Sequence, residues 1–287
     1  MRVLVASTAD QASKTIKKCL LDQYSFSKTG ELFEGEPVLK LEESNIDIRL
    51  VTTRKKPVHA EHLEKQLQPE LFVFLSKHRS ETGRPGLLTH VTGNWLATAE
   101  VGGEPKALGV APGYAVRAAF RTLSELAKVH QLPFQVNLEV THHGPTSLST
   151  PLLFVELGST EKEWLDEQAG NVVAIAAIEA VKAEPSGETV IGFGGGHYCP
   201  RFADLLRKTP LTTAHIAPKY VLDNLDKDMV TKALERSATP ISFAVIDHKG
   251  TLLHQREKIT TILDNLNLEA RRIDHVLREG DEQVVSY

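Results

Sequence analysis

Two adjacent histidines and a nearby carboxylate are the residues of this chain best suited to chemistry. His142 and His143 follow the β-prone run 137–140, and Glu156 lies inside the apolar run 152–157. Histidine is the commonest metal ligand and a frequent acid or base at neutral pH, and a glutamate is rarely fully buried without a partner. We therefore expect a hydrolytic or metal-binding site, although either histidine alone could simply cap a strand.

Further histidines occur at or just beyond the ends of other expected strands, namely His78, His90, His197 and His215. Ligands of open α/β sheets bind beyond the carboxyl ends of the strands, so we expect these side chains to gather there. Their spacing matches neither HExxH nor CxxC, and it does not identify zinc by itself. Successive strand side chains point to opposite faces, so His142 and His143 can share a metal only if the strand has ended, which Gly144 and Pro145 favour.

The chemistry available to such a cluster is hydrolysis. If two or three of these histidines and Glu156 hold zinc, the ion would lower the pKa of a bound water to about 7, which suffices for cleavage of an ester or an amide. Glu156 could instead act as the general base that takes the proton of the water. The sequence leaves both roles of Glu156 open.

The glycine-rich run Gly192–His197 has two interpretations. Its amides could cradle a phosphate or a carbonyl oxygen, or the run could form a tight turn after a strand. It matches neither GxxxxGK[ST] nor an amino-terminal GxGxxG, which disfavours a nucleotide cofactor. Cys199 shows no sign of activation, and Ser147 and Ser149 lack a GxSxG elbow, so a cysteine or serine nucleophile is disfavoured.

The elements that must position these residues alternate between strand and helix patterns. Residues 24–45 are mixed in character, and residues 247–251 resemble a turn more than a βα crossover, which predicts a mixed sheet. The fold class that we expect is α/β with one compact domain over residues 1–287 and no internal repeat. Strands are expected at 1–7, 46–51, 71–75, 87–90, 137–140, 152–158, 189–193, 211–217 and 241–246, and helices near 16–20, 59–67, 114–129, 160–182, 229–234 and 259–266.

Composition indicates a globular protein without a general affinity for polyanions. The chain of 287 residues is 41% hydrophobic and 24% charged, with a net charge of −4. Contact with a nucleic acid must therefore come from a local basic patch. The candidates are Arg54, Lys55 and Lys56, Lys77 with Arg79, and Arg84, each of which could equally be a solvated loop residue.

Cysteine usage and apolar runs indicate the compartment. Cys19 and Cys199 are too few for a disulfide framework, which suits the reducing cytoplasm. The first apolar run is too short for a signal peptide, and the longest one, Val172–Ile178, is far below the roughly 20 residues that cross a bilayer. We expect a cytoplasmic protein without a membrane span, and a monomer.

Four blocks of the sequence carry a resemblance to a known family. They are His90–Trp95, Thr141–Pro145, Phe154–Trp164 and Gly192–Tyr198. In order and spacing these blocks resemble the archaeal and plant type of D-aminoacyl-tRNA deacylase, over nearly the whole chain. The resemblance implies a zinc-dependent hydrolase that removes D-amino acids from tRNA. It also implies a three-layer phosphorylase/hydrolase-like α/β fold, similar to that of peptidyl-tRNA hydrolase.

The resemblance assigns roles to the candidate residues. We expect His90, His142, His143 and His197 to hold zinc, Glu156 and His143 to be catalytic, and the amides of Gly194, Gly195 and Gly196 to receive the oxyanion. Arg54, Lys55 and Lys56 would bind tRNA, with no role for DNA. L-Amino acids would be rejected sterically. The alternatives are a zinc-dependent peptidase or a nucleoside phosphorylase-like enzyme, and an RNA-binding module with structural histidines.

Overall fold

The largest sheet is mixed, as expected. The computed structural model describes residues 1–285, except for the side chains of residues 281–285. Within this part the strands run in the order β2-β3-β4-β1-β5-β10-β6-β9. The antiparallel pairs are β2 with β3, β3 with β4, and β6 with β10. The bounds are β1 (Arg2–Ser7), β2 (Phe26–Phe33), β3 (Glu36–Leu41), β4 (Ile48–Thr53), β5 (Phe72–Lys77), β6 (Gly86–His90), β9 (Gln135–Leu138) and β10 (Leu152–Gly158).

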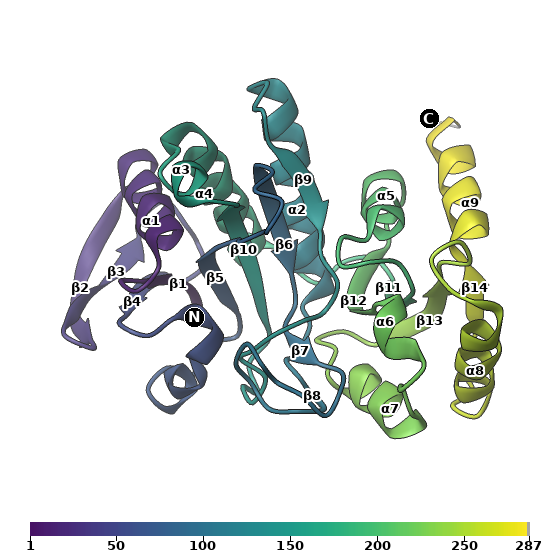
Figure 1. Ribbon diagram of the computed structural model, residues 1–287. Coiled ribbons are helices and arrows are strands. Elements are labelled where there is room, and N and C mark those ends of the chain that lie inside the picture. Colours follow the sequence, from purple (N-terminus) through teal and green to yellow (C-terminus); the bar gives the residue numbers. More distant parts are fainter. Residues whose placement is uncertain (286–287) are drawn as a thin grey trace.

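The second sheet is parallel and lies beside β9, the edge strand of the large sheet (Figure 1). It contains β12 (Thr212–Ala217), β11 (Thr189–Phe193), β13 (Ile241–Ile246) and β14 (Ala270–Arg272), in that order. β13 and β14 are parallel and are joined through the helix α8 (Leu253–Asp264). The interpretation of residues 247–251 as a reversing turn was therefore wrong, because they lead into a βα crossover.

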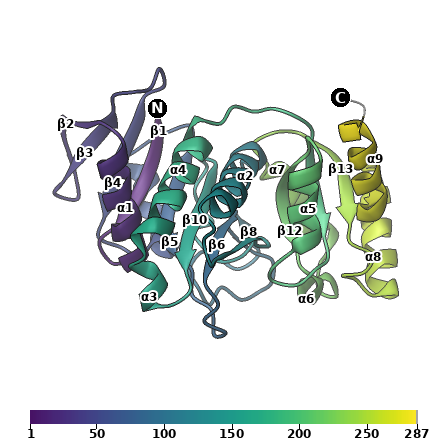
Figure 2. The ribbon, with the colours of Figure 1, turned by 90° about the horizontal axis from the view of Figure 1, so that it is seen from above.

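Helices form a continuous layer on one side of both sheets (Figure 2). In spatial order they are α1 (Gln11–Gln23), α4 (Glu167–Lys182), α2 (Gly113–Val129), α5 (Pro200–Lys208) and α9 (Ile273–Val285). The other face of the large sheet packs against the 3-10 helices η1 (Pro57–His59) and η2 (Glu61–Lys65). The same face of the small sheet packs against α6 (Lys219–Leu222), α7 (Lys227–Glu235) and α8. The three-layer α/β arrangement with a mixed central sheet is confirmed.

The two sheets share one apolar core and a hydrogen-bonded seam. A single buried cluster includes Val73 of the large sheet, Phe120 of α2 and Val190 of the small sheet. Residues 138–142 form the seam. They bond the large sheet through the Glu139 amide and Thr89 O, and the small sheet through the Thr141 amide and Ile216 O. This continuity supports the expected single domain, which stays a prediction, and residues 286–287 of its range lie outside the described residues.

Local differences from the sequence-based expectations have local causes. The single helix expected over 160–182 is divided into α3 (Glu161–Trp164) and α4, because the Asp166 carboxylate accepts a hydrogen bond from the Ala169 amide and begins a new helix. The unassigned residues 24–45 form the β2–β3 hairpin. Its two-residue turn, Glu34-Gly35, has positive φ at both positions, a conformation that suits the twist of paired strands.

The helix expected at 59–67 is replaced by η1 and η2, and the short ladder of β7 (Gly93–Asn94) and β8 (Ala107–Leu108) was not anticipated. Among residues 1–285, the helices are all too short or too polar to cross a membrane.

Candidate metal and hydrolase site

A cavity of about 520 Å³ collects most of the candidate residues. It opens between the end of β5, η1, the loop that joins β7 to β8, and the segment that follows β9. Of the residues expected at the site, those that line it are His78, His142, His143, Glu156, His197, Lys56, Lys77 and Arg79.

The side chains meet on one face of the large sheet, beside the middle of β10. Phe154 pairs with His90 of β6, and Glu156 pairs with Ser76 of β5, so all four side chains lie on the same face. Because β6 runs antiparallel to β10, its last residue lies beside the centre of β10. The expectation that the functional groups lie beyond the carboxyl ends of the strands was therefore wrong for Glu156, which lies inside β10, whereas His90 is the last residue of β6, as expected.

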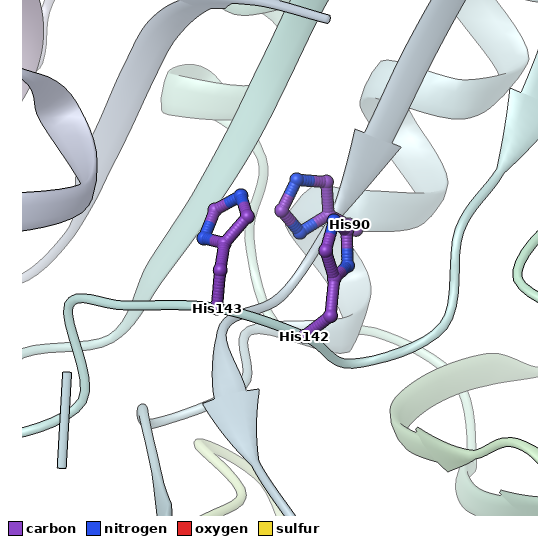
Figure 3. Close-up of side chains that lie close together, drawn as sticks. All are labelled: His90, His142 and His143. Atoms are coloured by element: carbon purple, nitrogen blue, oxygen red, sulfur yellow. The ribbon is translucent and has the colours of Figure 1, made fainter. Parts of the chain in front are cut away.

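His142 and His143 leave the strand so that both rings face one space. β9 ends at Leu138, and His143 has a φ of 45°, a left-handed conformation that is uncommon outside glycine. The two ring centroids are 4.5 Å apart and lie 4.1 Å (His142) and 4.7 Å (His143) from that of His90. Figure 3 shows the three rings gathered together. The end of the strand that a shared site requires is present.

Aromatic packing and a glycine hold this histidine cluster in place. The ring of Phe154 stacks on that of His90, with centroids 5.3 Å apart, and contacts the edge of His143 at 4.9 Å. A Cβ atom at Gly144 would lie only 2.3 Å from the amide nitrogen of Gly103. Glycine is therefore required where the histidine segment passes the 102–103 loop.

Main-chain carbonyls fix the tautomer of the three clustered histidines. The Nδ1 atoms lie 3.0 Å from Val91 O for His90, 2.8 Å from Val140 O for His142, and 2.6 Å from Gly144 O for His143. A carbonyl oxygen can only accept, so each Nδ1 carries the hydrogen and each neutral ring keeps a lone pair on Nε2. This is how a metal-binding histidine is usually oriented.

Glu139 is the main residue that the sequence analysis missed. Its side chain is fully buried, and neither carboxylate oxygen has a hydrogen-bond partner in the described part of the chain. Oε1 lies 2.9 Å from His197 Nε2 and 3.5 Å from His78 Nδ1, without hydrogen-bond alignment. The signal was the same as for Glu156, a glutamate between apolar neighbours in a strand-like run, and it could have been used.

Glu156 and His78 form the opposite wall of the cavity. Glu156 lies 3.5 Å from His78 Nδ1 and 3.7 Å from His90 Nε2. The other nitrogen of His78, Nε2, lies 2.9 Å from the Tyr198 hydroxyl. The Trp164 indole donates to the main-chain carbonyl of His78 at 2.8 Å, which anchors this histidine just after β5.

Burial and charge act in opposite directions on the titratable groups. Burial lowers the pKa of His142 well below its ordinary value and that of His143 to about 3, with further lowering by His90. Burial would also lower the pKa of His78 and His90, but contacts with Glu156 and Glu139 outweigh it and raise both values. For Glu156, burial raises the pKa, and His78 and His90 reverse this and hold it well below its usual range. In the metal-free site the carboxylates therefore favour the protonated form of His78 and His90, and burial favours the neutral form of His142 and His143.

The donor atoms fit a metal ion such as zinc. Ligand atoms of His90, His142 and His143 lie within 4.8 Å of one another, and so do those of Glu139, His142 and His197. The buried Nε2 of His90 and both oxygens of Glu139 lack hydrogen-bond partners among the side chains and main chain that the structure describes. Imidazole and carboxylate donors left without partners in a buried cluster are the ligand types that zinc prefers.

The glycine run and His215 do not lie where the sequence analysis placed them. Gly195 and Gly196 line a different cavity, and the amides of Gly194 and Gly195 already donate to Ala217 O and Gly250 O. The oxyanion role expected for these two amides is therefore not supported. His215 is buried in β12 with its nitrogens against Thr141 Oγ1 and Arg236 O, away from the cavity.

The basic residues fall into two groups, those that line the cavity and those that lie outside it. Lys56 reaches the cavity, whereas Arg54, Lys55 and Arg84 are exposed and do not line it. Lys77 lines the cavity and places its ammonium group 5.0 Å from the centre of the Trp164 ring.

Asp10 and His59 also line the cavity and were not anticipated. The buried carboxylate of Asp10 accepts the amides of Ser13 and Lys77, and so joins α1 to the end of β5. Burial raises its pKa. His59, at the end of η1, lies on the exposed rim.

Comparisons with known proteins agree over nearly the full length. A family model described as D-aminoacyl-tRNA deacylase matches residues 65–271, the range that contains the whole histidine cluster. A D-aminoacyl-tRNA deacylase of Methanosarcina acetivorans is 39% identical over 97% of this chain and 92% of its own length. One of Thermococcus onnurineus is 35% identical over 94% and 98%. A solved structure titled as a conserved protein of unknown function has a TM-score of 0.87 and 30% identity, and the match covers 97% of both chains.

Proposed function

The chain belongs to the D-aminoacyl-tRNA deacylase family, and from this premise we propose that it hydrolyses the ester between a D-amino acid and tRNA, releasing the free amino acid and tRNA. The observation that carries the proposal is the position of the histidine and glutamate cluster in the wall of a 520 Å³ cavity within the matched range. The proposed role is the recycling of tRNA charged with the wrong enantiomer.

The proposed cofactor is zinc, held by His90, His142 and His143, with His197 and Glu139 as the further donors of the cluster. When bound, zinc supplies Lewis acidity, which polarises a carbonyl group and lowers the pKa of water. The Nδ1 hydrogen bonds of the three clustered histidines support this assignment, because they hold the Nε2 lone pairs toward one space before any ligand arrives.

Glu156 is the proposed proton acceptor for the attacking water. Its carboxylate lines the cavity and is oriented by His78 on one side and His90 on the other. His78 is the group next to it that can hold a proton and return it to the ribose oxygen of the leaving tRNA, since its second nitrogen is oriented by the Tyr198 hydroxyl. His143 serves as a metal ligand in this scheme, and its catalytic role is exerted through the metal.

The mouth of the cavity suits a polyanionic substrate. Lys56, Lys77 and Arg79 lie around it, with Arg54 and Lys55 exposed beside Lys56. We propose that these cations bind phosphates of the tRNA acceptor end. Because the net charge of the chain is −4, the attraction for a polyanion must come from such a local basic patch. The proposed location is the cytoplasm, which a reaction on tRNA and two free buried cysteines support. The proposed acting unit is a monomer.

The test is hydrolysis of D-tyrosyl-tRNA and L-tyrosyl-tRNA by the purified protein, before and after chelation and with zinc restored. We expect rapid cleavage of the D ester alone, lost on chelation and regained with zinc. If the protein cleaves only the D ester and chelation does not change the rate, the proposed substrate stands and the proposed zinc cofactor is refuted. Cleavage of neither ester would refute the proposed function.

A further inference from the structure

A second cavity, of about 490 Å³, opens at the carboxyl ends of the parallel strands of the small sheet. Its wall includes Gly195 and Gly196 after β11, Lys219 and Tyr220 after β12, and Lys249 after β13. The chain passes from β11 to β12 on one side and then returns to β13 on the other side of β11. Crevices at such a reversal of strand order are the usual ligand sites of open parallel sheets.

The second cavity shares a wall with the site of the histidine cluster. Gly195 and Gly196 line the second cavity, and the next residue, His197, lines the first. This wall is fixed on the small sheet, because the Gly195 amide donates to Gly250 O at 3.0 Å and the Lys219 amide donates to Gly195 O at 2.9 Å. A ligand longer than one nucleotide could therefore occupy both cavities by crossing residues 196–198.

The exposed side chains of the second cavity are those that bind a single nucleic-acid strand. Tyr220 is 56% exposed. Lys219 and Lys249 are exposed, and their ammonium groups form no ion pair with the side chains of residues 1–280. The nearby carboxylate of Asp223 is already engaged by His254 Nε2 at 2.8 Å and Gln255 Nε2 at 3.0 Å. An aromatic ring beside unpaired cations offers a base a stacking surface and its phosphate a charge partner.

We propose that the second cavity binds an unpaired nucleotide that precedes the terminal adenosine of the aminoacyl-tRNA. Its base stacks on Tyr220, its phosphate lies between Lys219 and Lys249, and the strand crosses residues 196–198 to place the ester in the first cavity. This inference rests on the proposed function, because it requires an aminoacyl ester beside the histidine cluster. It gives the enzyme a means to recognise the RNA strand separately from the amino acid.

The first experiment compares D-tyrosyl-tRNA with the D-tyrosyl ester of adenosine, which can fill only the first cavity. For Tyr220→Ala we expect KM for the tRNA to rise by about tenfold with kcat unchanged, the loss that one stacked base implies. For the adenosine ester, kcat and KM of Tyr220→Ala should equal those of the unaltered protein. Tyr220→Phe keeps the stacking surface and should behave as the unaltered protein, which separates loss of stacking from misfolding.

The second experiment measures charge. In Lys219→Gln with Lys249→Gln, the logarithm of KM for the tRNA should depend less steeply on the logarithm of salt concentration, by about 0.7 for one phosphate of a single strand. Lys28→Gln is the matched control, since Lys28 is exposed on β2 at the far end of the molecule (Figure 1). Equal slopes for the double variant and the unaltered protein would overturn the phosphate contact.

Two outcomes separate this inference from the proposed function. The first outcome applies if the unaltered protein cleaves both D esters. If Tyr220→Ala then keeps its KM for the tRNA, or if its kcat/KM falls equally for both substrates, the second cavity is not a nucleotide site. If the unaltered protein cleaves neither ester, the proposed function fails. Binding of uncharged tRNA, measured without turnover, then tests the subsite alone, and an unchanged Kd for Tyr220→Ala would refute it.

Discussion

Replacing Glu139 by glutamine tests whether its buried carboxylate is kept for a cation. The side chain is fully buried, with two oxygens that lack hydrogen bonds among the described residues. In the metal-free protein a buried carboxylate without hydrogen bonds opposes folding, so Glu139→Gln should raise the free energy of unfolding by about 1–3 kcal/mol. In the zinc-bound protein the same change should weaken metal affinity by about 10–100-fold, because a charged donor or outer-shell partner is lost.

The two effects have opposite signs, which makes the assay decisive. Denaturant unfolding of the chelated protein gives the first quantity, and competition for zinc with a chromophoric chelator gives the second. Glu156→Gln is the matched comparison, because Glu156 contacts His78 and His90 and its loss should destabilise the metal-free protein. A chelated Glu139→Gln protein that is less stable than the unaltered one, together with unchanged zinc affinity, would refute the reasoning.

Further predictions concern the cluster, the basic loop and a distant anchor. Either His142→Ala or His143→Ala should lower kcat by more than about 100-fold while cooperative thermal unfolding persists; retained turnover in both would remove the metal model. Glutamine at residues 54–56 should flatten the salt dependence of KM for tRNA by about 0.9 per lost duplex phosphate contact, and an equal slope would identify the loop as a bystander. Glu64 accepts four hydrogen bonds from Ser149 and Thr150, which outweigh burial and lower its pKa from 4.5. A lowered folded-state pKa stabilises above the unfolded value, so Glu64→Gln should reduce unfolding free energy by about 1–2 kcal/mol at pH 7 and by progressively less below about pH 4.5. A constant difference from pH 7 to pH 3 would contradict this.

The sequence predicted the buried strands better than the surface elements. Runs such as 71–75 and 189–193 are apolar because both faces of the strand are covered, and that pattern is visible without a structure. The β2–β3 hairpin has mostly exposed strands, with alternation too weak to separate it from a loop. The break before α4 depends on the single capping carboxylate of Asp166, which a periodic apolar pattern conceals.

At the site, residue type was a better guide than strand order. The histidines at 78, 90, 142, 143 and 197 come together. His215 has the same sequence context, but both of its ring nitrogens form hydrogen bonds within the core. Glu139 lies between Leu138 and Val140, and a glutamate in such an apolar context needs a buried partner, so its place in the site could have been predicted. The position of the cluster could not be inferred, because it depends on β6 pairing antiparallel with β10, a register set by contacts far apart in the chain.

The seam at residues 138–142 also determines at which stage of protein synthesis the site can form. This segment carries Glu139 and His142, yet its amides bond Ile216 of β12 and the carbonyl of His197 as well as Thr89. A chain emerging from the ribosome displays His78, His90 and His143 long before β12 exists, and domains fold as units once their parts are available. The complete cluster of histidines and Glu139 therefore forms only after about three quarters of the protein has been synthesised, so unfinished chains contain the histidines of the cluster but no assembled pocket.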